Sequence, residues 1–273
     1  MAPELIVVMP AYNAALTLER TYRDLPKDRI AEVIVVDDAS QDDTVAIAQR
    51  LGLRVIVHAQ NKGYGANQKT CYLEALSAGA DIVVMVHPDY QYDARLVPEL
   101  VQPILDGRCD LMLGSRLLGG GPLAGGMPLY KLLANRFLTI VENWALGQHL
   151  SECHTGFRAY SRELLMTIPF VLNADDFSFD TQVIAQSVAF GFRIGEIGVP
   201  TRYFREASSV NLGQGIRYGL QTLGIMLAYA LDRWNVREYP GFRRKLADVL
   251  SGESWRRISH VGQRGPRYDS AQP

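Results

Sequence analysis

Apolar runs and amphipathic stretches alternate along the first 115 residues. The apolar runs fall at residues 5–9, 32–37, 54–58, 82–86 and 110–114. Runs of this length with few polar positions are typical of strands that are buried on both faces. Stretches with helical spacing lie between them, at residues 13–23, 43–51, 65–78 and 94–105. This alternation predicts βαβ units, and so an α/β fold with a mostly parallel sheet flanked by helices.

The alternation stops after Gly114. A glycine-rich loop is expected at residues 117–126, an amphipathic helix at 128–146, a short strand near 156–160, a helix at 179–190 and a strand at 199–203. Residues 213–234 predict a long, mostly apolar helix. We therefore expect one α/β domain over residues 1–235 that ends in this apolar helix, followed by an arginine-rich tail over residues 236–273.

Composition narrows the class of protein. The chain has 273 residues, 48% of them hydrophobic, which is enough for a sizeable core. A net charge of −1 argues against a nucleic-acid partner. Three cysteines without CxxC spacing argue against a disulfide framework or a zinc site and fit a reducing compartment. The longest apolar stretch, residues 218–231, is too short to span a bilayer, so we expect no integral membrane segment.

Polar residues and glycines follow all five predicted N-terminal strands. They stand at residues 10–13 (PAYN), 37–38 (DD), 61–65 (NKGYG), 87–91 (HPDYQ) and 114–116 (GSR). Ligands of parallel α/β sheets bind beyond the carboxyl ends of the strands, so we expect these five segments to form one site.

The residue types allow two interpretations at several of these positions. Asp37 and Asp38 are either turn and cap residues or acceptors for ribose hydroxyls and base N–H groups. Lys62 is either a solvated charge or a partner of a diphosphate. Residues 63–68 (GYGANQ) lack the third glycine of a dinucleotide fingerprint and follow the third strand, which argues against a nicotinamide enzyme.

The residues that follow the fourth predicted strand include candidate metal ligands. A carboxylate such as Asp89 at the end of a buried strand suits a hard divalent cation. His87 is either a structural residue or a ligand, and imidazole suits Mn²⁺ better than Mg²⁺. Arg116 is either a surface charge or a residue that captures phosphate.

Taken in order, these segments resemble a known family. PAYN, VVDDASQDDT, NKGYGAN, the D-x-D-like HPD, GSR, TGFRAYSR and YFREASS resemble the family 2 glycosyltransferases of the GT-A (Rossmann-like) fold, between about residues 4 and 232. The chain is most similar to the polyprenyl- or dolichyl-phosphate mannosyl- and glucosyltransferases. The resemblance implies inverting transfer of a hexose from a UDP- or GDP-sugar to a polyprenyl phosphate, with Mg²⁺ or Mn²⁺ as cofactor.

The resemblance also implies roles for individual residues. The nucleoside would be contacted by Pro10, Tyr12 and Asp38, with Asn13 and Asp37 beside them. Asp89 would be the second Asp of D-x-D, Gln91 the Gln that commonly follows it, and Arg116 would face the acceptor phosphate. Arg205 and Ser209 match the R-x-x-x-S element of a loop that closes over the donor diphosphate.

Three positions depart from the family pattern. His87 replaces the first Asp of D-x-D, and Ala14 follows Asn13 where a Glu is usual. Gly156 stands where some lipid-phosphate glucosyltransferases have an Asp base. The remaining candidates for a base are Asp175, Asp176 and Asp180, of which the first two are equally well explained as helix caps.

Alternatives remain for the acceptor and for the site of action. One is a glycosyltransferase that acts on a soluble or polysaccharide acceptor, and another is a non-catalytic nucleotide-sugar-binding protein. The helix at 213–234 either packs on the core or on a partner of an oligomer, or lies at a membrane surface. The basic tail would favour anionic headgroups. We expect a cytoplasmic protein, peripheral at the inner face of the cytoplasmic membrane.

Overall fold

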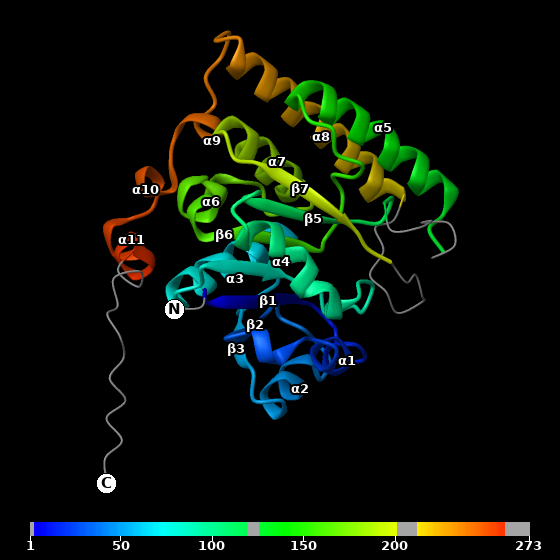
Figure 1. The fold of residues 1–273 in the computed structure, drawn as a ribbon, viewed down its shortest axis with the longest axis vertical. Helices are drawn as coiled ribbons and strands as arrows, with labels where there is room; N and C mark the ends of the chain where they lie inside the picture. Colours follow the sequence, from blue (N-terminus) through cyan, green and yellow to red (C-terminus); the bar gives the residue numbers. More distant parts are fainter. Residues whose placement is uncertain (1–2, 119–125, 201–211, 260–273) are drawn as a thin grey trace.

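A single seven-stranded sheet runs through the computed structural model, which describes residues 3–118, 126–200 and 212–259. Its strand order is β3-β2-β1-β4-β6-β5-β7 (Figure 1). The strands are β1 (Leu5–Ala11), β2 (Glu32–Asp37), β3 (Arg54–Val57), β4 (Ile82–Met85), β5 (Leu111–Ser115), β6 (Arg158–Ser161) and β7 (Ile194–Gly198). All neighbours pair in parallel except β6, which is antiparallel to both β4 and β5. The mostly parallel α/β sheet is thus confirmed.

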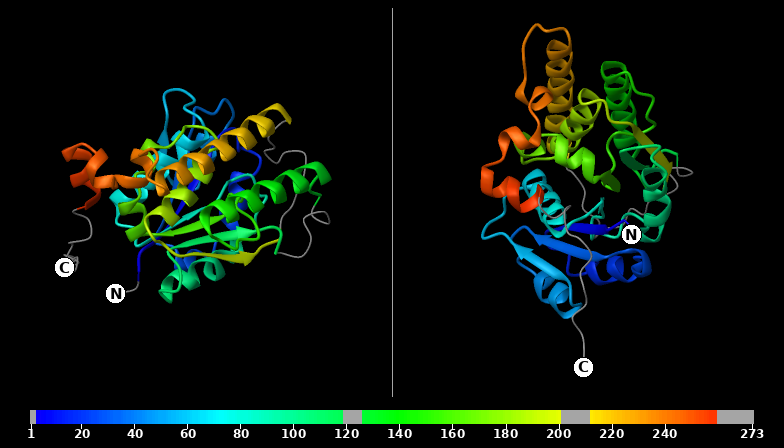
Figure 2. Two further views of the ribbon diagram at one scale, coloured as in Figure 1. Left: turned by 90° about the horizontal axis from the view of Figure 1, so that it is seen from above. Right: turned by 60° about the vertical axis from the view of Figure 1, so that its left-hand side comes forward.

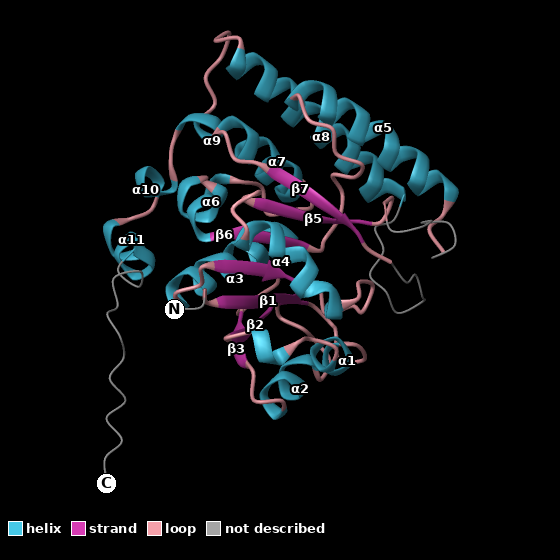
Figure 3. Cartoon of the chain, viewed as in Figure 1, coloured by secondary structure: helices cyan, strands magenta, loops and turns pink. Residues whose placement is uncertain are grey.

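Helices flank this sheet (Figure 3). Among the described residues the α-helices are α1 (Leu18–Arg23), α2 (Thr44–Arg50), α3 (Tyr64–Ala78), α4 (Val97–Leu105), α5 (Leu129–Leu146), α6 (Arg162–Thr167), α7 (Phe179–Ala189), α8 (Leu212–Arg233), α9 (Pro240–Arg243), α10 (Leu246–Val249) and α11 (Gly252–Ser259). Short 3₁₀ turns are η1 (Lys27–Arg29), η2 (Ala94–Leu96) and η3 (Phe170–Leu172).

Two expected elements lie elsewhere. The helix expected from residue 13 begins only at Leu18, because Asn13 is left-handed (φ 51°) and the N–H of Ala14 bonds to Thr44 Oγ1 at 2.8 Å instead of starting a helix. The strand expected at 199–203 is instead β7, which ends at Gly198. Residues 201–203 lie outside the described part of the chain.

The core has two parts, one on each face of the sheet. Along β1, Ile6 and Val8 point into a cluster formed with α3, α6, α7 and α8, while Val7 and Met9 point into a cluster formed with α1, α2 and α4. Because other residues cover both faces of β1, neither face carries polar side chains, and the sequence of β1 is therefore a continuous apolar run.

α5 and α8 lie side by side at one end of the molecule (Figures 1 and 2). Gly219 of α8 faces the side chain of Leu138 of α5. Within the described residues, no helix combines the length and the apolar character that crossing a bilayer requires.

The described part of the chain after residue 235 packs on the sheet domain. Leu246 and Ile258 are buried in the same cluster as α3 and α6. Arg257 pairs with Glu74 of α3 at 2.7 Å, and Arg162 of α6 donates to the carbonyl of Ile258 at 2.5 Å. Some of the arginines expected to form a basic tail are therefore bound within the protein, and the division at residue 235 stays a prediction.

A close backbone contact at Gly65 offers a test of this packing. A Cβ at Gly65 would collide with the carbonyl oxygen of Ala174 and would lie 2.8 Å from Cβ of Phe179. We expect Gly65→Ala to lower the free energy of unfolding by about 1–3 kcal/mol. Gly224→Ala in α8 is the matched control, because its Cβ meets no atom within 4 Å, and it should leave stability unchanged or raise it by up to about 1 kcal/mol. Denaturant unfolding measures both, and equal stability of Gly65→Ala and the wild type would contradict the contact.

Candidate functional site

The predicted site residues that the structure describes lie at one edge of the sheet, where the parallel strands end. Asn13 and Ser40, from the loops after β1 and β2, hold these loops together. The backbone N–H of Asn13 donates to Ser40 Oγ, and its side-chain Oδ1 accepts from the N–H of Gln41, both at 2.8 Å. Pro10 is buried at the end of β1, and the Tyr12 side chain, 54% exposed, lies in the same loop. The two loops are thus held together, with the ring of Tyr12 exposed beside them.

Asp37 and Asp38 are both buried and bonded within the protein. Asp37 accepts from the N–H of Ser40 at 2.9 Å. Asp38 Oδ1 accepts from the backbone N–H of Lys62 at 2.9 Å and contacts His58 Nδ1 at 2.7 Å, and its Oδ2 accepts from the N–H of Gly63 at 2.9 Å. Asp38 therefore fixes the loop after β3 and leaves the Lys62 side chain exposed. Contact of these residues with a nucleoside or a diphosphate stays a prediction.

Strained backbone marks the same edge. Of the four non-glycine residues with positive φ in the described ranges, Asn13, Ala39 and Tyr90 each follow directly after a residue expected at the site. A left-handed conformation is costly for residues such as Ala and Tyr and tends to occur at functional sites. At Tyr90, a hydrogen bond to Asp24 at 2.8 Å and the guanidinium of Arg20, 4.0 Å from the ring centre, hold the side chain in place.

Asp89 and His87 each present one open donor atom after β4. Asp89 Oδ1 accepts from the N–H of the buried Gln91 at 3.1 Å, whereas no described residue bonds Oδ2, and protein atoms do not enclose it. Burial raises the pKa of Asp89, and His87 opposes this effect. Burial also lowers the pKa of His87, although the negative charges of Asp89 and Asp180 act to raise it. Burial of His87 thus favours the uncharged form of the imidazole.

A chain of buried polar groups backs His87. The ring of Tyr64 stacks on the imidazole, with centroids 5.4 Å apart, and its hydroxyl oxygen lies 3.2 Å from His87 Nε2. This hydroxyl donates to Asp180 Oδ2 at 2.8 Å, and Gln68 donates to Asp180 Oδ1 at 3.1 Å. Asp180 Oδ2 also lies 3.5 Å from the fully buried guanidinium of Arg158. Asp180 is thus an acceptor for its neighbours, and its role as a catalytic base stays a prediction.

Two departures from the family pattern meet in space. A Cβ at Gly156 would lie 2.6 Å from His87 Cδ2 and 2.9 Å from Nε2. An Asp at position 156 therefore cannot coexist with the imidazole in its present place. The imidazole of His87 thus occupies space that a side chain at position 156 would need.

Arg116, at the end of β5, is held by a buried acid. Glu152 is fully buried and accepts from the N–H of Arg116 at 2.7 Å and from its Nε at 2.8 Å. Burial raises the pKa of Glu152, but the charge and hydrogen bonds of Arg116 outweigh burial and hold the pKa below its usual value. Burial, together with the nearby charge of Arg116, lowers the pKa of Lys131. Two cations, Arg116 and Lys131, thus lie close enough for their charges to interact, which favours an anion here.

Of the remaining predicted residues, two make other contacts and two lie outside the described part of the chain. Asp175 pairs with Lys69 at 2.7 Å, and Asp176 accepts from the N–H of Ser178 at 3.0 Å. Ser178 is the N-cap residue of α7, and no described side chain caps this helix by a hydrogen bond, so the expected capping by Asp175 or Asp176 is absent. Arg205 and Ser209 lie outside the described residues. Sequence reasoning did not find Tyr64, Arg158 or Glu152 as site residues, although Tyr64 and Arg158 stand inside the quoted motifs NKGYGAN and TGFRAYSR.

A divalent cation fits this site only together with a ligand. The described residues contain no group of three His, Cys, Asp or Glu side chains that could hold a metal ion. Asp89 Oδ2 and His87 Nδ1 are open and come from one strand end, so they supply two donor atoms. The other ligands would have to be water or the oxygens of a diphosphate, which is how Mg²⁺ is often held.

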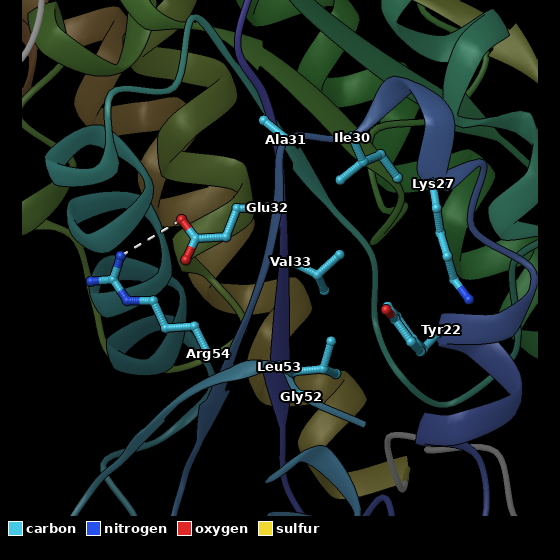
Figure 4. A pocket seen from close by; sticks show the side chains of 9 residues that line it. All are labelled: Tyr22, Lys27, Ile30, Ala31, Glu32, Val33, Gly52, Leu53 and Arg54. Carbon is cyan, nitrogen blue, oxygen red and sulfur yellow. Dashed lines mark ion pairs between the residues drawn. The ribbon is translucent and has the colours of Figure 1, made fainter. Parts of the chain in front are cut away.

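The structure also contains a cavity of about 430 Å³ at the opposite edge of the sheet (Figure 4). It lies where β2 and β3 begin, and its lining includes Lys27, Glu32 and Arg54. Glu32 and Arg54 pair across it at 3.8 Å. Since ligands of parallel sheets bind at the carboxyl ends of strands, this cavity is separate from the candidate site.

Comparison with known sequences agrees with the motif order. The model of the family described as "Glycosyl transferase family 2" matches residues 6–168. An uncharacterized protein of Methanocaldococcus jannaschii is 30% identical over 200 residues, which are 73% of this chain and 82% of the relative. The UDP-N-acetylglucosamine–dolichyl-phosphate N-acetylglucosaminyltransferase of Methanococcus voltae is 26% identical over 85% of this chain and all of the relative.

Comparison with solved structures supports the fold. Glucosyl-3-phosphoglycerate synthase of Mycobacterium tuberculosis, in complex with UDP, matches with a TM-score of 0.65 and 24% identity, over 84% of this chain and 80% of that chain. A complex of the same synthase with Mn²⁺, UDP-glucose and phosphoglyceric acid matches with a TM-score of 0.61. Because the family model covers more than half of the chain and the sheet matches this structure, the protein belongs to glycosyltransferase family 2 and is an enzyme of the GT-A fold.

Proposed function

We propose that this glycosyltransferase moves a hexose, with inversion, from a UDP- or GDP-sugar to a polyprenyl phosphate. One observation carries the choice of acceptor: a pair of cations lies at one end of a large exposed apolar surface. The relative from Methanococcus voltae, named for a dolichyl-phosphate acceptor, supports the same choice.

The apolar surface, which we call the α5–α8 face, consists of exposed large side chains on two adjacent helices. They are Leu129, Leu133, Phe137, Ile140 and Trp144 on α5, and Ile216, Leu220 and Leu227 on α8. Trp144, for example, is 81% exposed. Large exposed apolar side chains gathered on two adjacent helices favour an interaction site over ordinary surface. Tryptophan and arginine, such as Trp234 and Arg233 at the end of α8, suit a membrane interface.

The cationic pair links this face to the sugar-transfer site. Lys131 lies in the first turn of α5. Burial lowers the pKa of Lys131, and the nearby charge of Arg116 lowers it further. An acceptor with a phosphate head and an apolar tail would place its head at Arg116 and Lys131 and its tail along the α5–α8 face. We propose that the enzyme acts in this way as a peripheral protein at a membrane surface. Its cytoplasmic location and its oligomeric state stay predictions.

The donor would lie along the strand ends beyond β1 to β4. Asp89 and His87 would hold a Mg²⁺ or Mn²⁺ ion, which when bound neutralises charge on the departing diphosphate. Lys62 would face the diphosphate, because the backbone N–H groups of Lys62 and Gly63 are bonded to Asp38 and the Lys62 side chain is exposed. A phosphate acceptor is already anionic, so a strong base is not required, in agreement with a glycine at position 156 and a fully partnered Asp180.

A soluble phosphorylated acceptor is the second candidate. Its support is the cationic pair alone, because Arg116 and Lys131 would suit any phosphate monoester. The synthase that shares the fold is named for such an acceptor, phosphoglycerate. The α5–α8 face would then be covered by a second copy of the chain.

Transfer assays with UDP- and GDP-sugars separate the two candidates. We expect hexose transfer to a short polyprenyl phosphate and none to 3-phosphoglycerate, with either Mg²⁺ or Mn²⁺ present. Transfer to 3-phosphoglycerate alone would establish the second candidate. Nucleotide binding without transfer to either acceptor would mean a non-catalytic binding protein.

The α5–α8 face predicts a specific variant phenotype. Leu133→Ser combined with Phe137→Ser removes two exposed apolar side chains, each of which contributes about 1.5–3 kcal/mol when buried in lipid. We expect at least a tenfold loss of binding to lipid vesicles in a flotation assay. Leu172→Ser is the control, since Leu172 is also exposed but lies away from α5 and α8. Equal vesicle binding of the double variant and the wild type would contradict the membrane role.

The buried Arg116–Glu152 pair predicts a pH effect on stability. Because the pKa of Glu152 is depressed in the folded protein, this pair stabilises the fold above pH 4.5, and the gain is lost as the pH falls through the folded-state pKa. We expect Glu152→Gln to reduce stability at pH 7 by about 3–5 kcal/mol, since it leaves Arg116 without its counterion. The difference from the wild type should shrink in denaturant unfolding near pH 4. A difference that is constant with pH would show that the charge of Glu152 is not responsible.

A further inference from the structure

The hydroxyl of Tyr64 determines where the proton of His87 lies. A tyrosine hydroxyl has one hydrogen, and Tyr64 donates it to Asp180 Oδ2 at 2.8 Å. The hydroxyl oxygen can then only accept from its other neighbour, His87 Nε2 at 3.2 Å. The imidazole must therefore carry its proton on Nε2, which leaves a lone pair on Nδ1.

Asp180 is fixed as the acceptor in this chain. It is 7% exposed and lies beside Arg158, whose guanidinium is fully buried and lies 3.5 Å from Asp180 Oδ2. A buried guanidinium needs a charged partner, and Asp180 lies beside it with both carboxylate oxygens as acceptors. Gln68 donates to the other oxygen at 3.1 Å and prevents the carboxylate from turning.

His87 Nδ1 is left without a partner among the described residues. The side chain is half-buried, and Nδ1 is not among the fully buried unpaired atoms, so a ligand can reach it. The ring of Tyr64 stacks on the imidazole and fixes its plane. The absence of a side chain at Gly156 leaves room for the imidazole. Metal-binding histidines commonly have this arrangement, in which the second nitrogen donates to a fixed acceptor that orients the first.

We propose that Asp180 and Tyr64 are positioning residues that hold His87 with its Nδ1 lone pair toward the ligand beside Asp89, and that the site thereby selects Mn²⁺ over Mg²⁺. Both ions bind oxygen ligands, but Mn²⁺, a transition metal, accepts an imidazole nitrogen more readily than Mg²⁺ does. The presence of a cation rests on the proposed function. The preference for Mn²⁺ is assigned to the series of buried groups that runs from Arg158 through Asp180 and Tyr64 to His87.

The position of the proton can be measured without metal or substrate. In a long-range ¹H–¹⁵N correlation spectrum of the wild-type protein at neutral pH, His87 should show the neutral pattern with the proton on Nε2. A proton on Nδ1 would overturn the proposal. This measurement does not require any variant to fold.

Metal binding tests the consequence. Mn²⁺ and Mg²⁺ are titrated into the protein with UDP and, in parallel, with GDP, and binding is followed by calorimetry and, for Mn²⁺, by electron paramagnetic resonance. Tyr64→Phe keeps the stacked ring and removes only the hydroxyl, so Mn²⁺ affinity should fall by about 10- to 100-fold. Tyr229→Phe in α8 is the control, because Tyr229 is also buried but its ring packs on Phe242 rather than on His87, and it should retain Mn²⁺ affinity.

A third variant addresses selectivity. His87→Asp replaces the nitrogen donor with oxygen in a smaller side chain, and should reduce the preference for Mn²⁺ over Mg²⁺. Unchanged Mn²⁺ affinity in Tyr64→Phe, or an unchanged preference in His87→Asp, would overturn this inference while leaving the proposed transferase intact. Failure of the wild type to bind either metal with UDP or GDP would instead count against both.

Discussion

The ion pair between Arg158 and Asp180 is the contact on which the site depends. Arg158 lies on β6, the antiparallel strand between β4 and β5, and is completely buried, so its charge needs a partner inside the protein. Asp180, at the start of α7, is that partner and also accepts hydrogen bonds from Tyr64 and Gln68 of α3. One buried charge pair thus joins β6, α7 and α3 next to the strand end that carries His87 and Asp89.

The same principle applies around Arg116. Glu152 is fully buried and bound to Arg116, just as Asp180 is bound near Arg158, so the acidic side chains deepest in the site are neutralised within the protein. Both carboxylate oxygens of Asp38 likewise accept hydrogen bonds from the loop after β3. The atoms left open include one oxygen of Asp89 and one nitrogen of His87, and these are suited to a cation that arrives with a diphosphate.

Local sequence pattern was sufficient for the parallel part of the sheet, because β1, β2 and β4 are covered on both faces and their apolar runs report this directly. It was insufficient at Asn13, where a left-handed residue and bonds to the next loop replace a helix start, and at β7, whose half-buried strand has little periodicity. The loops that carry the site were predicted from their polar residues. The roles of Tyr64 and Glu152 were not, because they depend on partners 116 and 36 positions away.

The central claim is that the carboxylate of Asp89 holds the cation that binds the sugar donor. Asp89→Asn tests it most directly, since the amide oxygen can still accept from the N–H of Gln91 while the charge is removed. We expect the thermal midpoint to remain that of the wild type and sugar transfer at saturating Mn²⁺ to fall by about two to three orders of magnitude, the effect of losing several kcal/mol of charge stabilisation. A folded variant that transfers sugar at the wild-type rate would contradict the account.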